Sequence, residues 1–266
     1  MNTCSRLVTR ALFLLPALFA TASLLAQHPI DGTWRINYDQ SKLSQEPDVI
    51  FLDKGIYTCS SCTPKISIKA DGTDQPVAGH AFDTLSVREV DSKTIAAISK
   101  KDGKLVAENM VTVSDDGNTV TSKTTFHPPN GSQPVESEET SKRIGKAPTG
   151  PHAISGSWQT SKLAASDNGR IFTYKVTGEE LSFTDPTGAS YTAKLDGKDY
   201  PVSGSVGWTS VSVKRIGART IEETDKRDGK AYGVWKITAD PDVKKLIIVT
   251  TNLPSGDTST LVAERQ

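Results

Sequence analysis

The chain has 266 residues, with 31 Lys and Arg against 31 Asp and Glu, and 36% of its residues are apolar. This charge balance excludes a nucleic-acid-binding protein that works through a basic surface. After the first 26 residues, no apolar run reaches the roughly 18 residues that a membrane-spanning helix needs.

The N-terminus has the three-part pattern of a secretory signal peptide. Arg6 and Arg10 precede the apolar stretch Ala11–Ala20, and small residues then offer cleavage after Ala22 or Ala26. We therefore predict a signal peptide over residues 1–26 and a periplasmic or secreted mature protein. An uncleaved anchor helix is the alternative, although the apolar stretch is short for one.

Two cysteines follow in the mature chain, Cys59 and Cys62. In an oxidising compartment such a pair indicates a disulfide. Redox exchange would favour a first sulfur at a helix N-terminus, whereas Ile56-Tyr57-Thr58 favours a strand. A zinc site would need two further ligands, and no second pair exists. A structural disulfide is the prediction, thiol chemistry is the alternative, and no metal is expected.

Short β-strands account for the pattern of the rest of the chain. Polar and apolar residues alternate in Ile66–Lys69, Arg170–Val176 and Ser210–Lys214, and Leu246–Thr251 is rich in β-branched residues. Asp-Gly and Asn-Gly pairs suited to tight turns separate such segments, and no 3.6-residue apolar stripe occurs. The sequence predicts an all-β protein of antiparallel up-and-down barrels or sandwiches, with eight or nine strands in each copy of a repeat.

The repeat is a tandem duplication. Asp31-Gly-Thr-Trp34 recurs as Ser155-Gly-Ser-Trp158, and the block Asp71–Gly79 recurs as Asp196–Gly204. The matches keep their order, as duplication with small loop insertions would produce.

A Pro- and Gly-rich segment separates the two copies. Residues 146–151 contain Pro148, Gly150 and Pro151 and predict a linker. The predicted domains are therefore 27–145 and 152–266, each large enough for its own core.

The openings Gly32-Thr33-Trp34 and Gly156-Ser157-Trp158 resemble the first-strand signature of lipocalins and the wider calycin group. The resemblance implies barrels in which this Trp closes one end against a basic residue of the last strand. It thus implies the pairs Trp34 with Arg143 and Trp158 with Arg265. A guanidinium over an indole adds cation–π stabilisation of about 0.5–2 kcal/mol.

Residues with the character of a catalytic site are scarce. No nucleophile elbow, phosphate-binding loop, dinucleotide fingerprint or metalloprotease motif occurs in the mature chain, so we predict no catalytic residue and no cofactor. The repeated pairs Asp71/Asp74 and Asp196/Asp199 are interpreted as hairpin turns, with calcium binding the less favoured alternative. Glu222, Glu223 and Asp225 are interpreted as a solvated face, because Lys226 and Arg227 follow them.

We expect a non-enzymatic exported protein whose barrels, or the groove between them, hold a small apolar or amphipathic ligand. An envelope interaction module without a cavity and a thiol-redox protein are the alternatives. No nucleic-acid partner is expected, and a protein partner stays open. The expected ligand contacts are aromatic: Phe172, Tyr174, Tyr191, Trp208 and Trp235 in the second copy, and Phe51, Tyr57 and Phe82 in the first.

Overall fold

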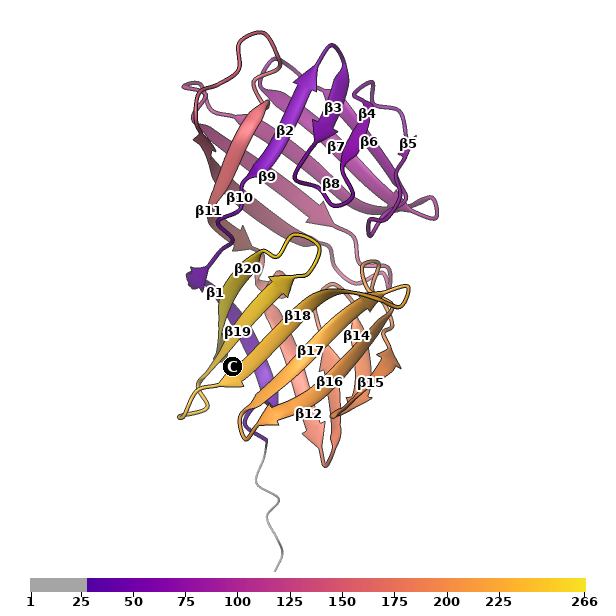
Figure 1. Ribbon diagram of the computed structural model, residues 1–266, viewed down its shortest axis with the longest axis vertical. Helices are drawn as coiled ribbons and strands as arrows, with labels where there is room; N and C mark the ends of the chain where they lie inside the picture. The colour runs from indigo at the N-terminus through magenta and orange to yellow at the C-terminus, as the bar shows by residue number, and fades with distance from the viewer. Residues whose placement is uncertain (1–27) are drawn as a thin grey trace, which may run out of the picture.

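The computed structural model describes residues 28–266, so the predicted signal peptide lies outside the described residues. The described chain is all-β, as predicted, and forms two antiparallel sheets of ten strands each that curl into nearly closed barrels. The barrels lie end to end along the long axis of the molecule (Figure 1). Each barrel has more strands than the eight or nine expected. A strand as short as β5, which has two residues, is too short to show the alternation of polar and apolar residues used to predict strands.

The first barrel is built from one continuous segment of chain. Its strands run in the spatial order β4-β3-β2-β11-β10-β9-β8-β7-β6-β5. They are β2 (Asp48–Asp53), β3 (Ile56–Cys59), β4 (Ile66–Lys69), β5 (Gln75–Pro76), β6 (Thr84–Glu89), β7 (Thr94–Lys101), β8 (Lys104–Val113), β9 (Thr119–Phe126), β10 (Val135–Ile144) and β11 (Gly156–Ala165).

The second barrel is built from two separate segments. Its spatial order is β14-β13-β12-β1-β20-β19-β18-β17-β16-β15. The strands are β1 (Gly32–Lys42), β12 (Ile171–Thr177), β13 (Glu180–Thr184), β14 (Ser190–Lys194), β15 (Asp196–Pro201), β16 (Ser210–Gly217), β17 (Thr220–Arg227), β18 (Lys230–Ala239), β19 (Lys245–Asn252) and β20 (Thr258–Arg265).

The two sequence copies exchange their first strands. Strand β1 of the first copy lies between β12 and β20 of the second, and β11 of the second copy lies between β10 and β2 of the first. Figure 1 shows the indigo β1 among the yellow and orange strands of the lower barrel. The barrels therefore do not coincide with residues 27–145 and 152–266. The segment 146–151 connects β10 to β11, which are neighbours in one sheet.

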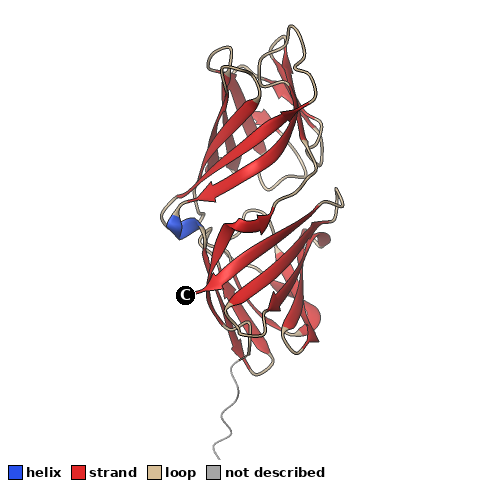
Figure 2. Ribbon diagram, turned by 90° about the vertical axis from the view of Figure 1, so that its left-hand side faces the viewer, coloured by secondary structure: helices blue, strands red, loops and turns tan. Residues whose placement is uncertain are grey.

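The chain passes between the barrels twice, at residues 43–47 and 166–170. The second passage contains the 3-10 turn η1 (Asp167–Gly169), which lies between the barrels in Figure 2. Asp167 forms ion pairs with Arg35 of β1 and with Arg170. Gln159 of β11 donates hydrogen bonds of 3.0 Å to the backbone and side-chain oxygens of Gln45. Each passage is therefore bonded to the strand that precedes the other passage.

The exchange corrects the Trp–Arg pairs that the resemblance implied. Arg265 lies over Trp34, with the guanidinium carbon 4.3 Å from the ring centroid, and Arg143 lies over Trp158 at 3.9 Å. Each Trp packs against the last strand of the copy to which it does not belong. The stacking itself occurs in both barrels, but the partners are exchanged.

The Gly-x-Trp triplet has the same geometry in both barrels. The indole nitrogens of Trp34 and Trp158 donate to the carbonyl oxygens of Ile30 and Ile154, at 2.9 and 2.8 Å. Gly32 has a φ of 144°, and a Cβ there would collide with the Arg265 guanidinium. A glycine is therefore required two residues before each Trp so that the arginine can reach the ring.

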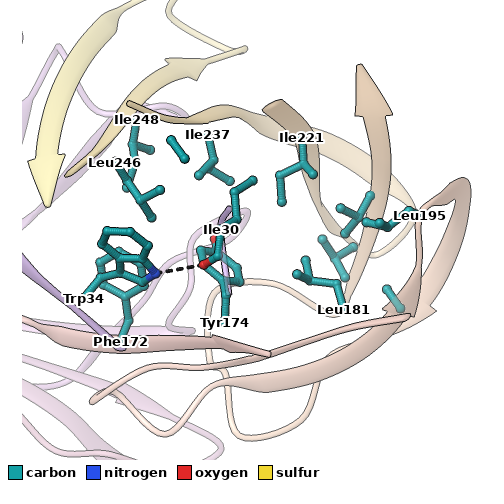
Figure 3. Close-up of a cluster of buried hydrophobic side chains, with 14 of the residues drawn as sticks. Ile30, Trp34, Phe172, Tyr174, Leu181, Leu195, Ile221, Ile237, Leu246 and Ile248 are labelled. Atoms are coloured by element: carbon teal, nitrogen blue, oxygen red, sulfur yellow. Dashed lines mark hydrogen bonds between the residues drawn. The ribbon is translucent and has the colours of Figure 1, made fainter. Parts of the chain in front are cut away.

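The interior of the second barrel is packed with side chains from most of its strands. Trp34 from the exchanged strand is fully buried and contacts a cluster that includes Phe172, Leu246 and Ile248. Figure 3 shows these side chains converging from opposite walls of the barrel, and its dashed line marks the Trp34–Ile30 hydrogen bond. At about 25 cal/mol per Å² of apolar surface, burial of this strand face contributes strongly to the stability of the second barrel.

Two kinds of predicted turn behave differently. Asp102-Gly103 and Asp228-Gly229 form two-residue hairpin loops with positive φ at both positions, as expected. Asp196-Gly197 does not form the predicted hairpin turn. Both residues lie in the edge strand β15 (Asp196–Pro201), at a register irregularity between Asp196 and Asp199.

Candidate functional site

A groove of about 900 Å³ lies between the two barrels. Its walls come from the disulfide loop and the 79–82 segment of the first barrel, from the β17–β18 and β19–β20 turns of the second, and from the first passage. The lining residues are Ser44, Glu46, Pro47, Asp48, Ser61, Cys62, Thr63, Pro64, Gly79, His80, Ala81, Phe82, Thr160, Arg227, Asp228, Lys230, Ala231, Tyr232, Asn252, Pro254, Ser255 and Asp257.

Half-buried rings form one wall of the groove. His80 stacks on Phe82, with ring centroids 5.3 Å apart and planes 13° apart. On the opposite barrel, Arg227 lies 5.0 Å from the centre of the Tyr232 ring. Burial, and then the positive charge of Arg227, lower the pKa of His80, so this imidazole is neutral at pH 7. This part of the lining is therefore aromatic and includes the guanidinium of Arg227.

Arg227 also joins the two barrels across this wall. Its Nε donates to the carbonyl of Gly207 at 2.6 Å, and its Nη1 donates to the carbonyl of Gly79 in the first barrel at 3.0 Å. A guanidinium can hold both carbonyls because its donors are fixed in one plane. One side chain of the groove lining therefore bonds to the backbone of both barrels.

Carboxyl groups also line the groove. Asp48 lies on the rim, and burial on its protein side raises its pKa, with smaller contributions from the charges of Glu139 and Asp257. Ser61 donates a hydrogen bond of 3.4 Å to Asp48, and Glu46 lies two residues away in the same lining. The groove lining as a whole contains four acidic residues, Glu46, Asp48, Asp228 and Asp257, against the two basic residues Arg227 and Lys230.

The predicted disulfide forms between Cys59 and Cys62. Cys59 is buried in the core of the first barrel, whereas Cys62 reaches the groove. The backbone N–H of Cys62 donates to the Cys59 sulfur at 3.1 Å. The loop that carries Ser61 and Pro64 into the groove is thus fixed to β3.

The structure brings four of the predicted ligand-binding aromatics together inside the second barrel. Phe172, Tyr174, Tyr191 and Trp208 surround Phe183, which the sequence did not single out, with neighbouring ring centroids 5.1–6.3 Å apart. Tyr174 and Tyr191 are buried, and Trp208 is half-buried.

Trp235 is linked to this interior by a hydrogen bond to Asp225, which the sequence pattern had placed on a solvated face. Glu223 and Asp225 are each only 3% exposed, so the interpretation of this segment as a solvated face is wrong for both. Glu222 does face outward and pairs with Lys214 at 2.7 Å. The alternation of side chains along a β-strand would have predicted this burial. Ile221 faces the core, and residues 223 and 225 therefore lie on the same face.

The buried acids are held by hydrogen bonds from the surrounding rings. Glu223 Oε2 accepts from the hydroxyl of Tyr191 at 2.6 Å and from that of Tyr174 at 3.4 Å. Asp225 Oδ2 accepts from the indole N–H of Trp235 at 2.7 Å. Burial raises the pKa of Asp225 to about 7, and burial followed by the charge of Asp225 raises the pKa of Glu223 well above its usual range.

The three ligand contacts predicted in the first copy lie outside this aromatic interior of the second barrel. Phe82 is in the groove, but Phe51 points outward from β2 and is 43% exposed. Tyr57 packs against the core of the first barrel, where burial raises its pKa to about 12. Neither Phe51 nor Tyr57 lines the groove.

The repeated aspartate pairs also lie outside the groove. Asp71 accepts from the backbone and hydroxyl of Thr73, and Asp74 pairs with Lys100 at 2.7 Å. In the other copy, Lys226 pairs with Asp199 at 2.5 Å. Among residues 28–266, no group of three or more His, Cys, Asp or Glu is placed to hold a metal ion.

The part of the chain that the structure describes contains no helix of the length and apolarity needed to cross a membrane. Searches with protein-family models and against curated proteins gave no match to this chain.

Proposed function

We propose that this protein is an exported, non-enzymatic binding protein and that the groove between its barrels holds a small amphipathic molecule. The observation that carries the proposal is the groove of about 900 Å³, which lies in the size range of small-molecule sites and takes its walls from both barrels. A calycin-like ancestry of each barrel agrees with such a role and forms part of the proposal.

The two sides of the groove favour a ligand with an apolar body and a polar end. His80, Phe82 and Tyr232 offer ring surface, while Asp48 and Glu46 add carboxyl groups to the same lining. Rings fixed by packing lose little side-chain entropy when a ligand binds. A molecule that lays its apolar part on the rings and keeps its polar end at the rim would satisfy both sides.

Binding can be tested with the neutral apolar fluorophore N-phenyl-1-naphthylamine. We expect saturable fluorescence enhancement with the wild-type protein. The affinity for the fluorophore should fall at least ten-fold in Phe82→Ala and in Tyr232→Ala. Phe51→Ala is the matched control, because Phe51 is an exposed ring of the first barrel outside the groove. Absence of saturable binding, or an equal loss in Phe51→Ala, would remove the groove as the site.

Export is the second part of the proposal. The Cys59–Cys62 disulfide agrees with an oxidising compartment. N-terminal sequencing of the protein from its host should give a chain that begins at Ser23 or Gln27. A chain that still begins at Met1 in the cytoplasmic fraction would contradict export.

A further inference from the structure

The two cysteines of the disulfide have different environments. Cys59, the last residue of β3, is 4% exposed and packs in the core of the first barrel. Cys62 is half-buried and lines the groove together with its neighbours Ser61, Thr63 and Pro64. A nucleophile that enters the groove therefore meets the sulfur of Cys62, whereas the core shields the sulfur of Cys59.

The shielded sulfur has two hydrogen-bond donors beside it. The backbone N–H of Cys62 donates to Cys59 Sγ at 3.1 Å, and the hydroxyl of Ser61 lies 3.6 Å from the same atom. A neutral sulfur is a weak acceptor, but hydrogen bonds to a charged acceptor are roughly twice as strong as neutral ones. Both contacts therefore stabilise Cys59 more when it is a thiolate than when it is part of the disulfide.

Ser61 is held in position to supply its proton to that thiolate. Its Oγ accepts from the backbone N–H of Val49 at 3.0 Å and donates to Asp48 Oδ1 at 3.4 Å, so strand β2 fixes the oxygen. A hydroxyl has one proton and rotates freely. A negative charge on Cys59 Sγ would draw this proton from Asp48 to the sulfur without movement of the heavier atoms. Donors that are already in place for a developing charge favour the reaction that produces it.

The loop that carries Cys62 is also fixed on both sides. The backbone N–H of Ser60 donates to the carbonyl of Val49 at 2.9 Å. Pro64 packs against the 79–82 segment so closely that a Cβ on Gly79 would stand 2.7 Å from Pro64 Cγ. The stacked rings of His80 and Phe82 belong to this segment and line the groove with Cys62. A small molecule that reaches Cys62 thus finds ring surface in the same lining.

We propose that the Cys59–Cys62 disulfide is a thiol–disulfide exchange site for small thiols that enter the groove. The thiolate of the small molecule attacks Cys62 Sγ, and the bond between the two cysteine sulfurs breaks. A mixed disulfide forms at Cys62, and Cys59 leaves as a thiolate that accepts from the Cys62 N–H and the Ser61 hydroxyl.

A second molecule of the thiol completes the exchange. Its thiolate attacks the small-molecule sulfur of the mixed disulfide, which releases a small-molecule disulfide and leaves Cys62 as a thiolate. Each cysteine thiolate then takes up one proton. Two small thiols are thus oxidised by two electrons, and the protein disulfide is reduced to two thiols.

A disulfide that serves only to fix the loop would behave in the opposite way. Folding would then shield it, and thiols would reduce it more slowly in the native protein than in the unfolded chain. In an exchange site the fold presents Cys62 and stabilises the leaving Cys59, so the native protein reacts faster. The effect of unfolding on the reduction rate therefore distinguishes the two roles.

The test measures the rate at which 2-mercaptoethanol reduces the full mature protein at pH 8, in buffer and in urea that unfolds the chain. Samples are quenched with iodoacetamide and analysed by mass spectrometry. We expect reduction at least ten-fold faster in the native protein, with the transient mixed disulfide on Cys62. A native rate equal to or below that of the unfolded chain, or a mixed disulfide on Cys59, would overturn the proposal.

Two serine variants show whether the leaving group is stabilised as proposed. Ser61→Ala removes the hydroxyl beside Cys59 and should slow reduction of the native protein at least five-fold. Ser60→Ala, at an exposed neighbour in the same loop, is the matched control and should keep the wild-type rate. In urea all three proteins should react equally, because the fold no longer places the hydroxyl. Equal native rates for Ser61→Ala and wild type would refute the assignment.

The exchange site and the amphipathic ligand can fail separately. Saturable binding of N-phenyl-1-naphthylamine by a protein whose disulfide is shielded in the native state would keep the proposed binding function and reject the exchange site. Fast native reduction in a protein that does not bind the fluorophore would support the exchange site and reject that ligand.

Discussion

Arg265, the last residue of strand β20, stacks on Trp34 of strand β1, with 4.3 Å between the guanidinium carbon and the ring centroid. The guanidinium also donates to the carbonyls of Val243 and Pro29, at 2.8 and 3.1 Å. This one residue therefore connects β20, the turn before β19 and the exchanged N-terminal segment. The relationship holds the first copy's opening strand in the second copy's barrel.

The stacked pair can be tested by removing the guanidinium. Arg265→Ala should lower the free energy of unfolding of the second barrel by about 2–4 kcal/mol, because cation–π stabilisation is lost and carbonyls are left without donors. The measurement is urea unfolding followed by tryptophan fluorescence. Arg219→Ala, at an exposed arginine of the same barrel, is the control and should change stability little. Equal stability of both variants would contradict this role.

A double-mutant cycle tests the exchange of strands directly. Trp34→Leu should show a coupling energy of about 0.5–2 kcal/mol with Arg265→Ala and none with Arg143→Ala. Residues in contact couple, whereas residues in different barrels do not. Coupling of Trp34 to Arg143 would mean that each copy keeps its own first strand.

Fragments provide a second view of the exchange. Residues 43–166 contain all ten strands of the first barrel in one piece, so this fragment should fold alone. Residues 27–145 lack β11 and carry β1 without its acceptor strands, so this fragment should be largely unfolded or should associate. Dispersion of the amide signals in NMR distinguishes the outcomes. A well-folded monomer of residues 27–145 would argue against the exchanged arrangement.

The buried acids predict an unusual pH dependence of stability. The pKa of Asp225 is about 7 in the folded protein and near 3.8 when unfolded, so between these values the folded state binds more protons. Its contribution to stability is therefore full below pH 4 and lost as pH rises through 7. Each pKa unit corresponds to about 1.4 kcal/mol.

Asp225→Asn isolates this effect from that of other groups. His28 and His80 have lowered pKa values in the folded state, so they act in the opposite direction, stabilising the protein as pH rises. Urea unfolding at pH 5, 6, 7 and 8 should show that Asp225→Asn gains stability relative to wild type as pH increases. A constant difference across this range would show that Asp225 does not titrate there.

The disulfide should act as a local clamp of the first barrel. Cys59 and Cys62 are three residues apart, so chain-entropy arguments give a stabilisation of about 2 kcal/mol. The double variant Cys59→Ser/Cys62→Ser should lose this amount in urea unfolding and should bind N-phenyl-1-naphthylamine more weakly, because Pro64 and Cys62 line the groove. Unchanged stability would contradict a structural role for the disulfide and would favour the alternative of thiol chemistry.

The local features of this protein follow from residues that are close together in the sequence. Alternating residues and Asp-Gly pairs predicted antiparallel strands and hairpins such as the one at Asp102-Gly103, and the pair Cys59/Cys62 predicted a disulfide. Each of these depends on residues only a few positions apart, so the pattern contains the needed information. The glycine and tryptophan of each opening triplet were likewise identified, together with the basic residue type that covers the ring.

Which strand each of these elements pairs with depends on contacts between distant parts of the chain. Two similar copies offer two equivalent sheet edges, and a local pattern cannot choose between them for β1 or β11. The structure shows the outcome on either side of the passage at residues 43–47: β1 pairs with β12 and β20, whereas β2 pairs with β11. The burial of Glu223 and Asp225 was decided at the same level. Their charge suggested solvent, but the register set by Ile221 directs both side chains into a barrel closed by another copy's strand.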